Sequence, residues 1–356
     1  MIKSIIKSKY FPVMILAVIN LTIAYFYIKI PFICWSDFLT YQNAVNFITG
    51  NEVISFDRLF ARLLTMPLSL FIGFALGFGN LAKGFVIMNI IFYFAVIWIF
   101  YKLVFEIWKD KIAALASTML LQSNFWFFSY GAAYLADLGG HFFFLSSSFF
   151  AVKYFLNNEK KYFYYAVFSA SIGMFFKEFG ALGMLTLGML ILFSDIAWKK
   201  KFIEILRAAA WFLILPGIYH LWFYLKFDYT YVDWFMVPVE IDSETKSSFG
   251  LMVKVLGWLF FAGWPIFLFA LWQIKKYFKK QDYKIVLAML PASLAFFAWP
   301  FFMQRTAFVL VPWLATCCGF GLSKIKSRHI IAIILILYII INYNIEKLIK
   351  IINLPF

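Results

Sequence analysis

The sequence predicts an all-α integral membrane protein with about eleven transmembrane helices. Of its 356 residues, 64% are hydrophobic and 14% are charged, and the mean hydropathy is +0.86. A soluble domain is closer to half apolar and a quarter charged. Apolar runs long enough to cross a bilayer recur along the chain. Phe, Tyr and Trp make up 23% of the residues, as expected for lipid-facing surfaces and interfacial belts.

The first apolar run sets the expected orientation. Lys3, Lys7 and Lys9 precede a run from 10 to 32, a pattern typical of an uncleaved signal-anchor. Because basic segments stay on the cytoplasmic side, the N-terminus is expected inside and the first loop, 33–83, outside.

The first outer loop is predicted to hold an interfacial helix pair. A helix over 37–49 would place four apolar side chains on one face, namely Tyr41, Ala44, Val45 and Ile48. Gly50 and Asn51 would end it. A second short helix is expected over 56–64. The apolar segment 66–80 is too short to span comfortably and is interpreted as interfacial or re-entrant.

The remaining chain is predicted to cross the membrane repeatedly, with short connections. The expected spans are 84–106, 112–130, 138–156, 163–176, 179–197, 208–226, 251–274, 285–303, 306–322 and 330–344. The second large outer loop is 226–250. No repeat or domain boundary is evident, so residues 1–356 are treated as a single transmembrane domain without a separate soluble domain.

The net charge of +15 follows this topology. With these spans, the inner side carries the whole excess of Lys and Arg and the outer side is neutral, as expected for loops that face anionic lipid. Nucleic-acid binding is not needed to explain the charge. The three cysteines form no disulfide framework and no CxxC motif.

Ionisable side chains near the outer face are the candidate site residues, because such groups are costly at membrane depth. They are Asp37, Arg58, Arg62, Asp137, His141, Lys177, Glu178, His220 and Arg305. Each also has a structural explanation: an Asp can cap a helix, a histidine can pack in the core, and Lys or Arg can reach the headgroups. The sequence contains no nucleotide-binding loop, serine-nucleophile motif or HExxH motif, which favours chemistry on a donor that arrives already activated.

The order of these features resembles the C-type superfamily of membrane glycosyltransferases, especially the protein-mannosyltransferase-like branch. The motifs are Asp37-x3-Tyr41-x2-Ala44-x5-Gly50, Arg62-Leu63-Leu64-Thr65-Met66-Pro67-Leu68, an Asp at Asp137, the Lys177-Glu178 turn, and Arg305 before a span with Pro312. The similarity runs from residue 1 to about 325, and each motif alone is weak. Three features depart from the branch: Phe38 stands where a second acid is common, the usual double proline is reduced to Pro67, and the large C-terminal soluble domain is missing.

This resemblance implies an inverting transfer of a sugar from a polyprenyl-phosphate donor to a glycan, lipid or protein acceptor. Asp37 would be the base that deprotonates the acceptor hydroxyl. Lys177 and Arg305 would contact the departing phosphate, with Glu178, His220, Arg58 and Arg62 as further substrate contacts. Asp137 with His141 would order the acceptor or hold Mg²⁺ or Mn²⁺, and no residue is firmly assigned as a metal ligand.

Two other functions remain open from the sequence. One is a flippase or transporter for a lipid-linked sugar, although the repeated halves common in transporters are not evident. The other is a non-catalytic subunit of a glycosylation complex, which the missing second loop acid favours. In each case the expected location is a bacterial or archaeal cell membrane.

Overall fold

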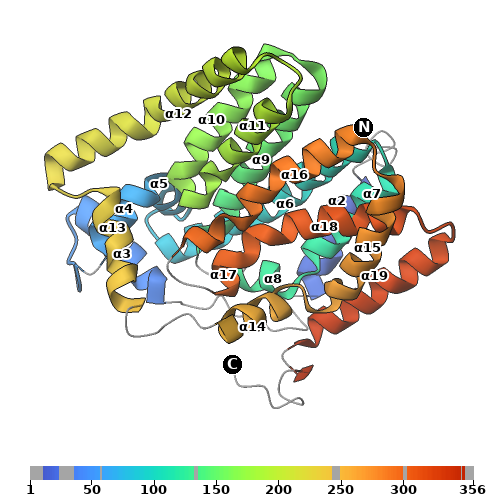
Figure 1. The fold of residues 1–356 in the computed structure, drawn as a ribbon. Coiled ribbons are helices and arrows are strands. Elements are labelled where there is room, and N and C mark those ends of the chain that lie inside the picture. Colours follow the sequence, from blue (N-terminus) through green and yellow to red (C-terminus); the bar gives the residue numbers. More distant parts are fainter. Residues whose placement is uncertain are drawn as a thin grey trace, which may run out of the picture.

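The structure is a computed structural model that describes residues 11–23, 36–56, 58–131, 135–242, 249–299, 303–345 and 347–348. All regular elements in these ranges are helices (Figure 1). The predicted all-α class is therefore confirmed. Much of the predicted first span lies outside the described residues, and only α2 (Phe11–Ile23) of that span is seen. The stretch 344–356, expected to extend the last span or to lie on the membrane surface, is also largely outside the described residues.

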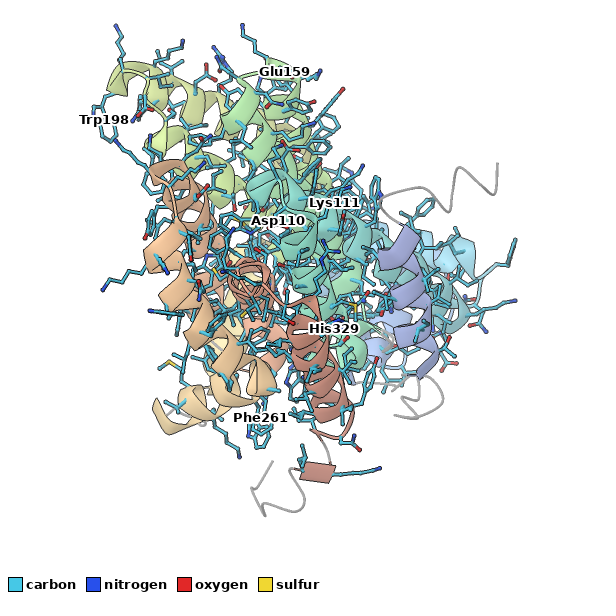
Figure 2. The ribbon with its side chains drawn as sticks, turned by 90° about the vertical axis from the view of Figure 1, so that its right-hand side faces the viewer. Asp110, Lys111, Glu159, Trp198, Phe261 and His329 are labelled. Carbon is cyan, nitrogen blue, oxygen red and sulfur yellow. The ribbon has the colours of Figure 1, made fainter. Side chains whose placement is uncertain are left out.

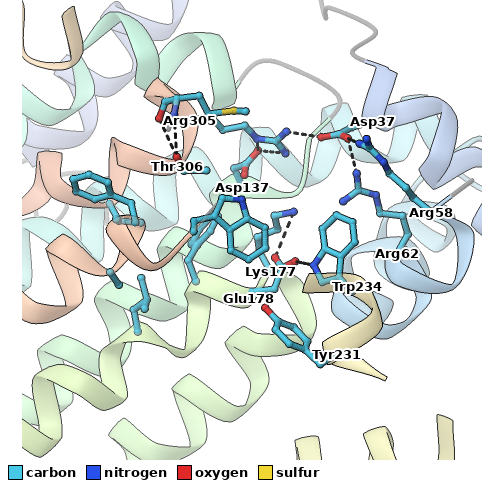
Figure 3. Close-up of a pocket in the computed structure, with 17 residues that line it drawn as sticks. Asp37, Arg58, Arg62, Asp137, Lys177, Glu178, Tyr231, Trp234, Arg305 and Thr306 are labelled. Carbon is cyan, nitrogen blue, oxygen red and sulfur yellow. Dashed lines mark hydrogen bonds and ion pairs between the residues drawn. The ribbon is translucent and has the colours of Figure 1, made fainter. Parts of the chain in front are cut away.

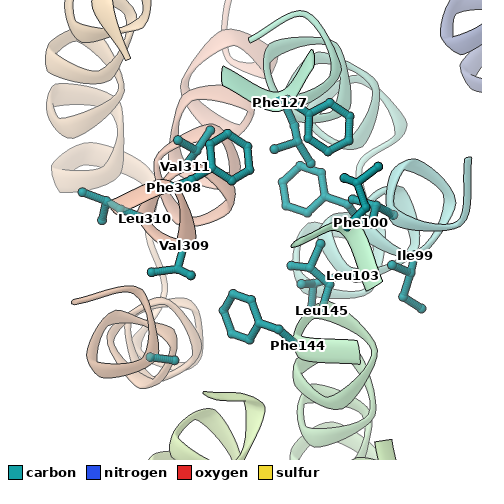
Figure 4. Packing of buried hydrophobic residues seen from close by; sticks show 14 of the residues in the cluster. Ile99, Phe100, Leu103, Phe127, Phe144, Leu145, Phe308, Val309, Leu310 and Val311 are labelled. Carbon is teal, nitrogen blue, oxygen red and sulfur yellow. The ribbon is translucent and has the colours of Figure 1, made fainter. Parts of the chain in front are cut away.

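Four helices at the centre of the molecule contribute a large share of the core. They are α6 (Leu81–Trp108), α7 (Lys111–Gln122), α9 (Asp137–Asn157) and α18 (Val311–Ser323), with contacts between α6 and α9 and between α7 and α18. Figure 4 shows Phe100, Phe127, Phe144 and Phe308 facing one another in this core. Close packing of large aromatic side chains supplies dispersion contacts that lipid tails cannot match.

A second group of helices packs beside this centre. α10 (Lys160–Phe176) lies against α9, and α11 (Gly183–Phe193) lies between α9 and α16 (Lys280–Leu294). α12 (Trp198–Phe227) contacts α10 and α11. The remaining long elements, α15 (Trp264–Tyr277) and α19 (Arg328–Tyr343), flank α18 and α7 respectively.

The exposed surface of α12 is largely apolar between Trp211 and Leu225. Trp211, Leu213, Ile218, Leu221 and Leu225 are all exposed. A contiguous exposed apolar face of this kind is unfavourable in water and is what a lipid-facing helix needs. Together with the composition, this surface indicates an integral membrane protein.

The number of spans is not settled by helix length. Within the described residues, three helices are long and apolar enough to cross a membrane alone, and five spans result if each of two bent pairs counts as one. Several other predicted spans correspond to helices of fewer than 18 residues. The count of eleven therefore stays a prediction.

Two predicted spans are broken in the structure. The segment 112–130 divides into α7 and α8 (Phe125–Gly131), because the Asn124 side chain accepts a hydrogen bond from Trp126 N at 3.0 Å and donates one to Leu259 O at 2.9 Å. The segment 251–274 divides into α14 (Phe249–Leu259) and α15, which are bent by 77°. An uninterrupted apolar run does not reveal such breaks, since the partner that stabilises the break is distant in sequence.

The segment predicted to be the first outer loop contains the expected short helices. α3 (Ser36–Thr49) matches the expected interfacial helix, and α4 (Leu59–Thr65) matches the second short helix. α5 (Pro67–Leu76) follows after a 90° bend, which is consistent with a broken span or a re-entrant turn. Tyr219 donates a hydrogen bond to Leu63 O at 2.6 Å and Ser69 donates one to Phe176 O at 2.8 Å, so α12 and α10 hold this pair in place.

Figure 2 labels several residues at helix ends that the predicted topology places on the cytoplasmic side: Glu159 and Trp198 at the top, Asp110 and Lys111 below them, and His329 lower still. The orientation itself stays a prediction.

Candidate active site

A cavity of about 330 Å³ brings together residues from six separate parts of the chain. Its charged lining, within the described residues, consists of three carboxylates and four cations: Asp37, Asp137, Glu178, Arg58, Arg62, Lys177 and Arg305. Figure 3 shows these side chains around one space. Seven of the nine predicted site residues therefore share a pocket, although no contact between them could be read from their spacing.

Asp37 lies at the first turn of α3 and binds two arginines with its two oxygens. Its Oδ1 is 2.5 Å from Arg62 Nη2, and its Oδ2 is 2.5 Å from Arg305 Nη1. Arg58 Nη1 lies 4.0 Å from Oδ1. Charge-assisted bonds of this length are among the stronger polar contacts in proteins. The carboxylate predicted to be a base is thus fully engaged with cations in this state.

The surroundings of Asp37 shift its pKa. Burial acts to raise the pKa, but the positive charges of Arg62, Arg305 and Lys177 outweigh burial and hold the pKa of Asp37 well below its ordinary value. In this arrangement Asp37 is a stable anion and a weak proton acceptor.

Arg62 is held by α3 as well as by Asp37. Its Nε donates to Thr40 Oγ1 at 2.9 Å, and its guanidinium lies over the rings of Tyr41 and Trp234 at 5.1 and 5.3 Å from their centroids. The Arg62 side chain is only 3% exposed. A cation over aromatic rings in a partly desolvated site gains additional stabilisation.

Arg305 belongs to the short helix α17 (Gln304–Ala307) and joins the two aspartates. Its Nε donates to Asp137 Oδ2 at 3.0 Å while its Nη1 binds Asp37. Thr306 fixes this helix end, accepting from Met303 N at 3.4 Å and donating to Met303 O at 3.0 Å. The other oxygen of Asp137, Oδ1, is buried and has no hydrogen-bond partner within the described residues. A substrate hydroxyl could satisfy it.

Lys177 and Glu178 lie where α10 ends, as predicted. Lys177 is in an extended conformation and its Nζ lies 3.4 Å from Glu178 Oε2. The close approach depends on Gly140, because a Cβ there would lie 2.7 Å from Lys177 Cβ and 2.5 Å from Phe179 Cε2. The start of α9 therefore needs glycine for Lys177 to reach the pocket.

The predicted outer loop 226–250 contributes a helix to the site. In α13 (Tyr231–Asp242), Trp234 donates to Glu178 Oε1 at 3.2 Å, and Tyr231 also lines the pocket. Trp299 lies 6.2 Å from Trp234 between ring centroids. The aromatic residues among the loop acids were the available signal. Residues 243–248 of this loop lie outside the described residues.

The two predicted histidines are not part of the pocket lining. The His141 ring packs between Phe179 and Phe308, with centroids 4.6 and 5.0 Å away, and is 3% exposed. His220 stacks on Tyr231 at 6.3 Å. Both are in packing environments in this state, and a substrate-binding role for either stays a prediction.

A metal site gains no support from this geometry. Asp137 pairs with Arg305 while His141 is enclosed by phenylalanines, so the two do not converge on one point. The described residues contain no group of three or more His, Cys, Asp or Glu side chains that could hold a metal ion. Whether Mg²⁺ or Mn²⁺ is required stays a prediction, and the mechanism below uses only the chain's own groups.

No family model and no curated protein sequence matches the chain. Its fold resembles that of the archaeal oligosaccharyltransferase AglB from Archaeoglobus fulgidus, determined in complex with an inhibitory peptide and a dolichol-phosphate. The TM-score is 0.57 at 14% identity, and the match covers 96% of this chain. A second A. fulgidus oligosaccharyltransferase structure, tethered to an acceptor peptide, matches 79% of this chain and 45% of that chain at 14% identity. Its TM-score of 0.46 is too low to show a shared fold.

The likeness to AglB is one of fold. The chain spans 56% of the length of that protein. At 14% identity this likeness shows a shared fold, and the C-type glycosyltransferase superfamily stays a prediction. The protein-mannosyltransferase-like branch stays a prediction.

Proposed function

We propose that this chain is an inverting glycosyltransferase that moves a sugar from a polyprenyl-phosphate donor to an acceptor on the outer face of the membrane. The observation that carries the proposal is the pocket itself, which combines carboxylates, cations and aromatic side chains next to apolar helices. The fold of the chain, which resembles that of the oligosaccharyltransferase AglB, supports glycosyl transfer over other chemistries.

The charges of the pocket fit a single phosphate. Four cations and three carboxylates give the described lining a formal net charge of +1. A sugar linked through one phosphodiester carries one negative charge, whereas a diphosphate link carries two. Charge balance in a partly buried site therefore favours the monophosphate donor.

The reaction follows from these groups. The acceptor hydroxyl oxygen attacks the anomeric carbon as the bond from that carbon to the phosphate oxygen breaks, and the bonding electron pair leaves with the phosphate. The hydroxyl proton passes to Asp37. Arg305 and Lys177 stabilise the charge that develops on the phosphate, and Asp137 Oδ1 orients an acceptor hydroxyl. A single displacement inverts the anomeric centre.

Purified protein in lipid nanodiscs, incubated with radiolabelled polyprenyl-phosphate sugars, tests this proposal. We expect transfer of label by the wild type and a loss of at least about 100-fold in the Asp37→Asn variant, the usual scale for removing a general base. A well-folded Asp37→Asn variant that transfers normally would show that Asp37 is not the base.

Reconstitution of the purified protein into sealed proteoliposomes distinguishes the alternatives. Translocation of the lipid without formation of a new glycosidic bond would favour a flippase. Activity that appears only with a co-purified partner would favour a non-catalytic subunit.

A further inference from the structure

Asp37 faces a conflict between its proposed role and its surroundings. Both of its oxygens bind guanidinium groups at 2.5 Å, and its pKa is held well below the ordinary value by these cations. A carboxylate in this state accepts a proton poorly. The same two arginines, together with Lys177, are also candidates to bind the donor phosphate, since a guanidinium binds phosphate and carboxylate with the same fork of donors.

We infer that the donor phosphate displaces Asp37 from Arg62 and Arg305, and that this exchange of partners frees the base only when the donor is bound. The inference rests on the proposed function and deepens it. In the empty enzyme Asp37 occupies the two arginines that the phosphate would bind. In the complex Asp37 is released and acts as the base.

Each arginine has a second anchor that would keep it in place during the exchange. Arg62 retains the hydrogen bond from Nε to Thr40 Oγ1 and its contacts with two aromatic rings. Arg305 retains the bond from Nε to Asp137 Oδ2. Asp37 is therefore not needed to position either guanidinium, and the Nη atoms that now hold it point into the pocket.

The two aspartates consequently have opposite effects on donor binding. Asp37 occupies the phosphate-binding atoms, so removing its charge opens the site. Asp137 binds Arg305 through Nε, while Asp37 binds the same guanidinium through Nη1. Removing the charge of Asp137 therefore lets Arg305 turn fully toward Asp37, which blocks the phosphate-binding atoms. A site that depended only on total charge would respond to both substitutions in the same direction.

The test compares Asp37→Asn with Asp137→Asn, two substitutions that change charge and size equally. Binding of a long-chain polyprenyl phosphate to protein in nanodiscs is measured, with the matching polyprenol as the uncharged lipid. We expect Asp37→Asn to bind about tenfold tighter than wild type if the open arrangement is about one-tenth populated. Asp137→Asn should bind several-fold more weakly. Glu52→Gln, an exposed acid that does not line the pocket, should bind as wild type does.

The outcomes separate the inference from the proposed function. Equal or weaker binding by Asp37→Asn, with normal binding by wild type, would overturn the exchange of partners and leave the lipid-phosphate site intact. Tighter binding by both aspartate variants would also overturn it, in favour of simple charge neutralisation. If no protein prefers the phosphate over the polyprenol, the proposed function itself fails. Should Asp37→Asn fold poorly, Asp137→Asn alone decides, since weaker binding supports the exchange and tighter binding contradicts it.

Discussion

At the scale of single residues, the site is defined by how Asp37, Asp137, Arg62 and Arg305 share their charges. Asp37 binds both arginines, and Asp137 binds only Arg305. Phe38, which follows Asp37, is buried and packs edge-on against Phe85. It anchors α3 to α6 and contributes no charge, so no second carboxylate adjoins Asp37 in α3.

This arrangement predicts the pH dependence of transfer. The groups that face Asp37 are Arg58 and Arg62 of α4, Lys177 after α10 and Arg305 of α17, all cationic. Because they depress the pKa of Asp37 in the free enzyme, the stabilising charge of Asp37 is present above its unfolded pKa and is lost only as the pH falls through the lower folded pKa. The free enzyme should thus keep Asp37 ionised well below pH 4, the usual range of Asp.

Steady-state kinetics over pH 3 to 8 measure the difference between free and bound enzyme. The profile of kcat/KM reports groups of the free enzyme and should lack an acid limb from Asp37 near pH ~4. The profile of kcat reports the complex and should show such a limb, because the phosphate then engages the arginines. Two superimposable profiles would contradict the exchange.

At the scale of elements, close packing at the start of α9 positions the end of α10. Gly140 leaves room for Lys177 and Phe179, and an added Cβ would lie within 2.7 Å of both. We expect Gly140→Ala to cost about 1–3 kcal/mol of stability, as overpacking usually does, and to weaken polyprenyl phosphate binding by displacing Lys177.

Gly188→Ala in α11 is the matched control for this substitution. A Cβ at Gly188 would meet nothing within 4 Å, so replacing a helical glycine there should be neutral or stabilising by up to about 1 kcal/mol. Thermal unfolding in detergent measures both variants. Equal melting temperatures for the two would show that the space around Gly140 is not tight.

The element scale also shows where reading the sequence succeeded. α3 and α4 were predicted because apolar side chains at helical spacing are a local signal, and α3 begins and ends within one residue of the predicted limits. The break at Asn124 was missed, because its partner Leu259 is 135 positions away. The sequence predicts a loop where the structure has α13, since the charged and aromatic residues of this segment lack an obvious apolar face.

At the scale of the whole molecule, the predicted topology can be tested directly. It places α13 on the outer side and the start of α12 on the inner side. After replacement of Cys34 by Ser, Asp233→Cys should react with a membrane-impermeant thiol reagent in intact cells, since Asp233 is exposed. Lys200 is also exposed, near the start of α12. Because the predicted topology places this end of α12 in the cytoplasm, Lys200→Cys should react only after permeabilisation. The reverse pattern would invert the topology and move the pocket to the cytoplasmic face.

The native cysteines do not obscure this experiment. Cys317 and Cys318 are buried in α18 and are free thiols. The variant that carries only the Cys34→Ser replacement measures the background labelling. This labelling should stay low in intact cells because buried thiols react slowly.

The sequence by itself determined the all-helical membrane class and the set of ionisable residues from which the site is built. These are local properties, since hydropathy, helical spacing and the order of charged residues are read within one segment at a time. Only the tertiary structure decided which charges meet. Arg62 is 25 positions from Asp37 and Arg305 is 268 positions away, yet both bind the same carboxylate. That pairing depends on where the fold places α3, α4 and α17. As a result, the carboxylate that the sequence predicts to be a free base is bound by two arginines.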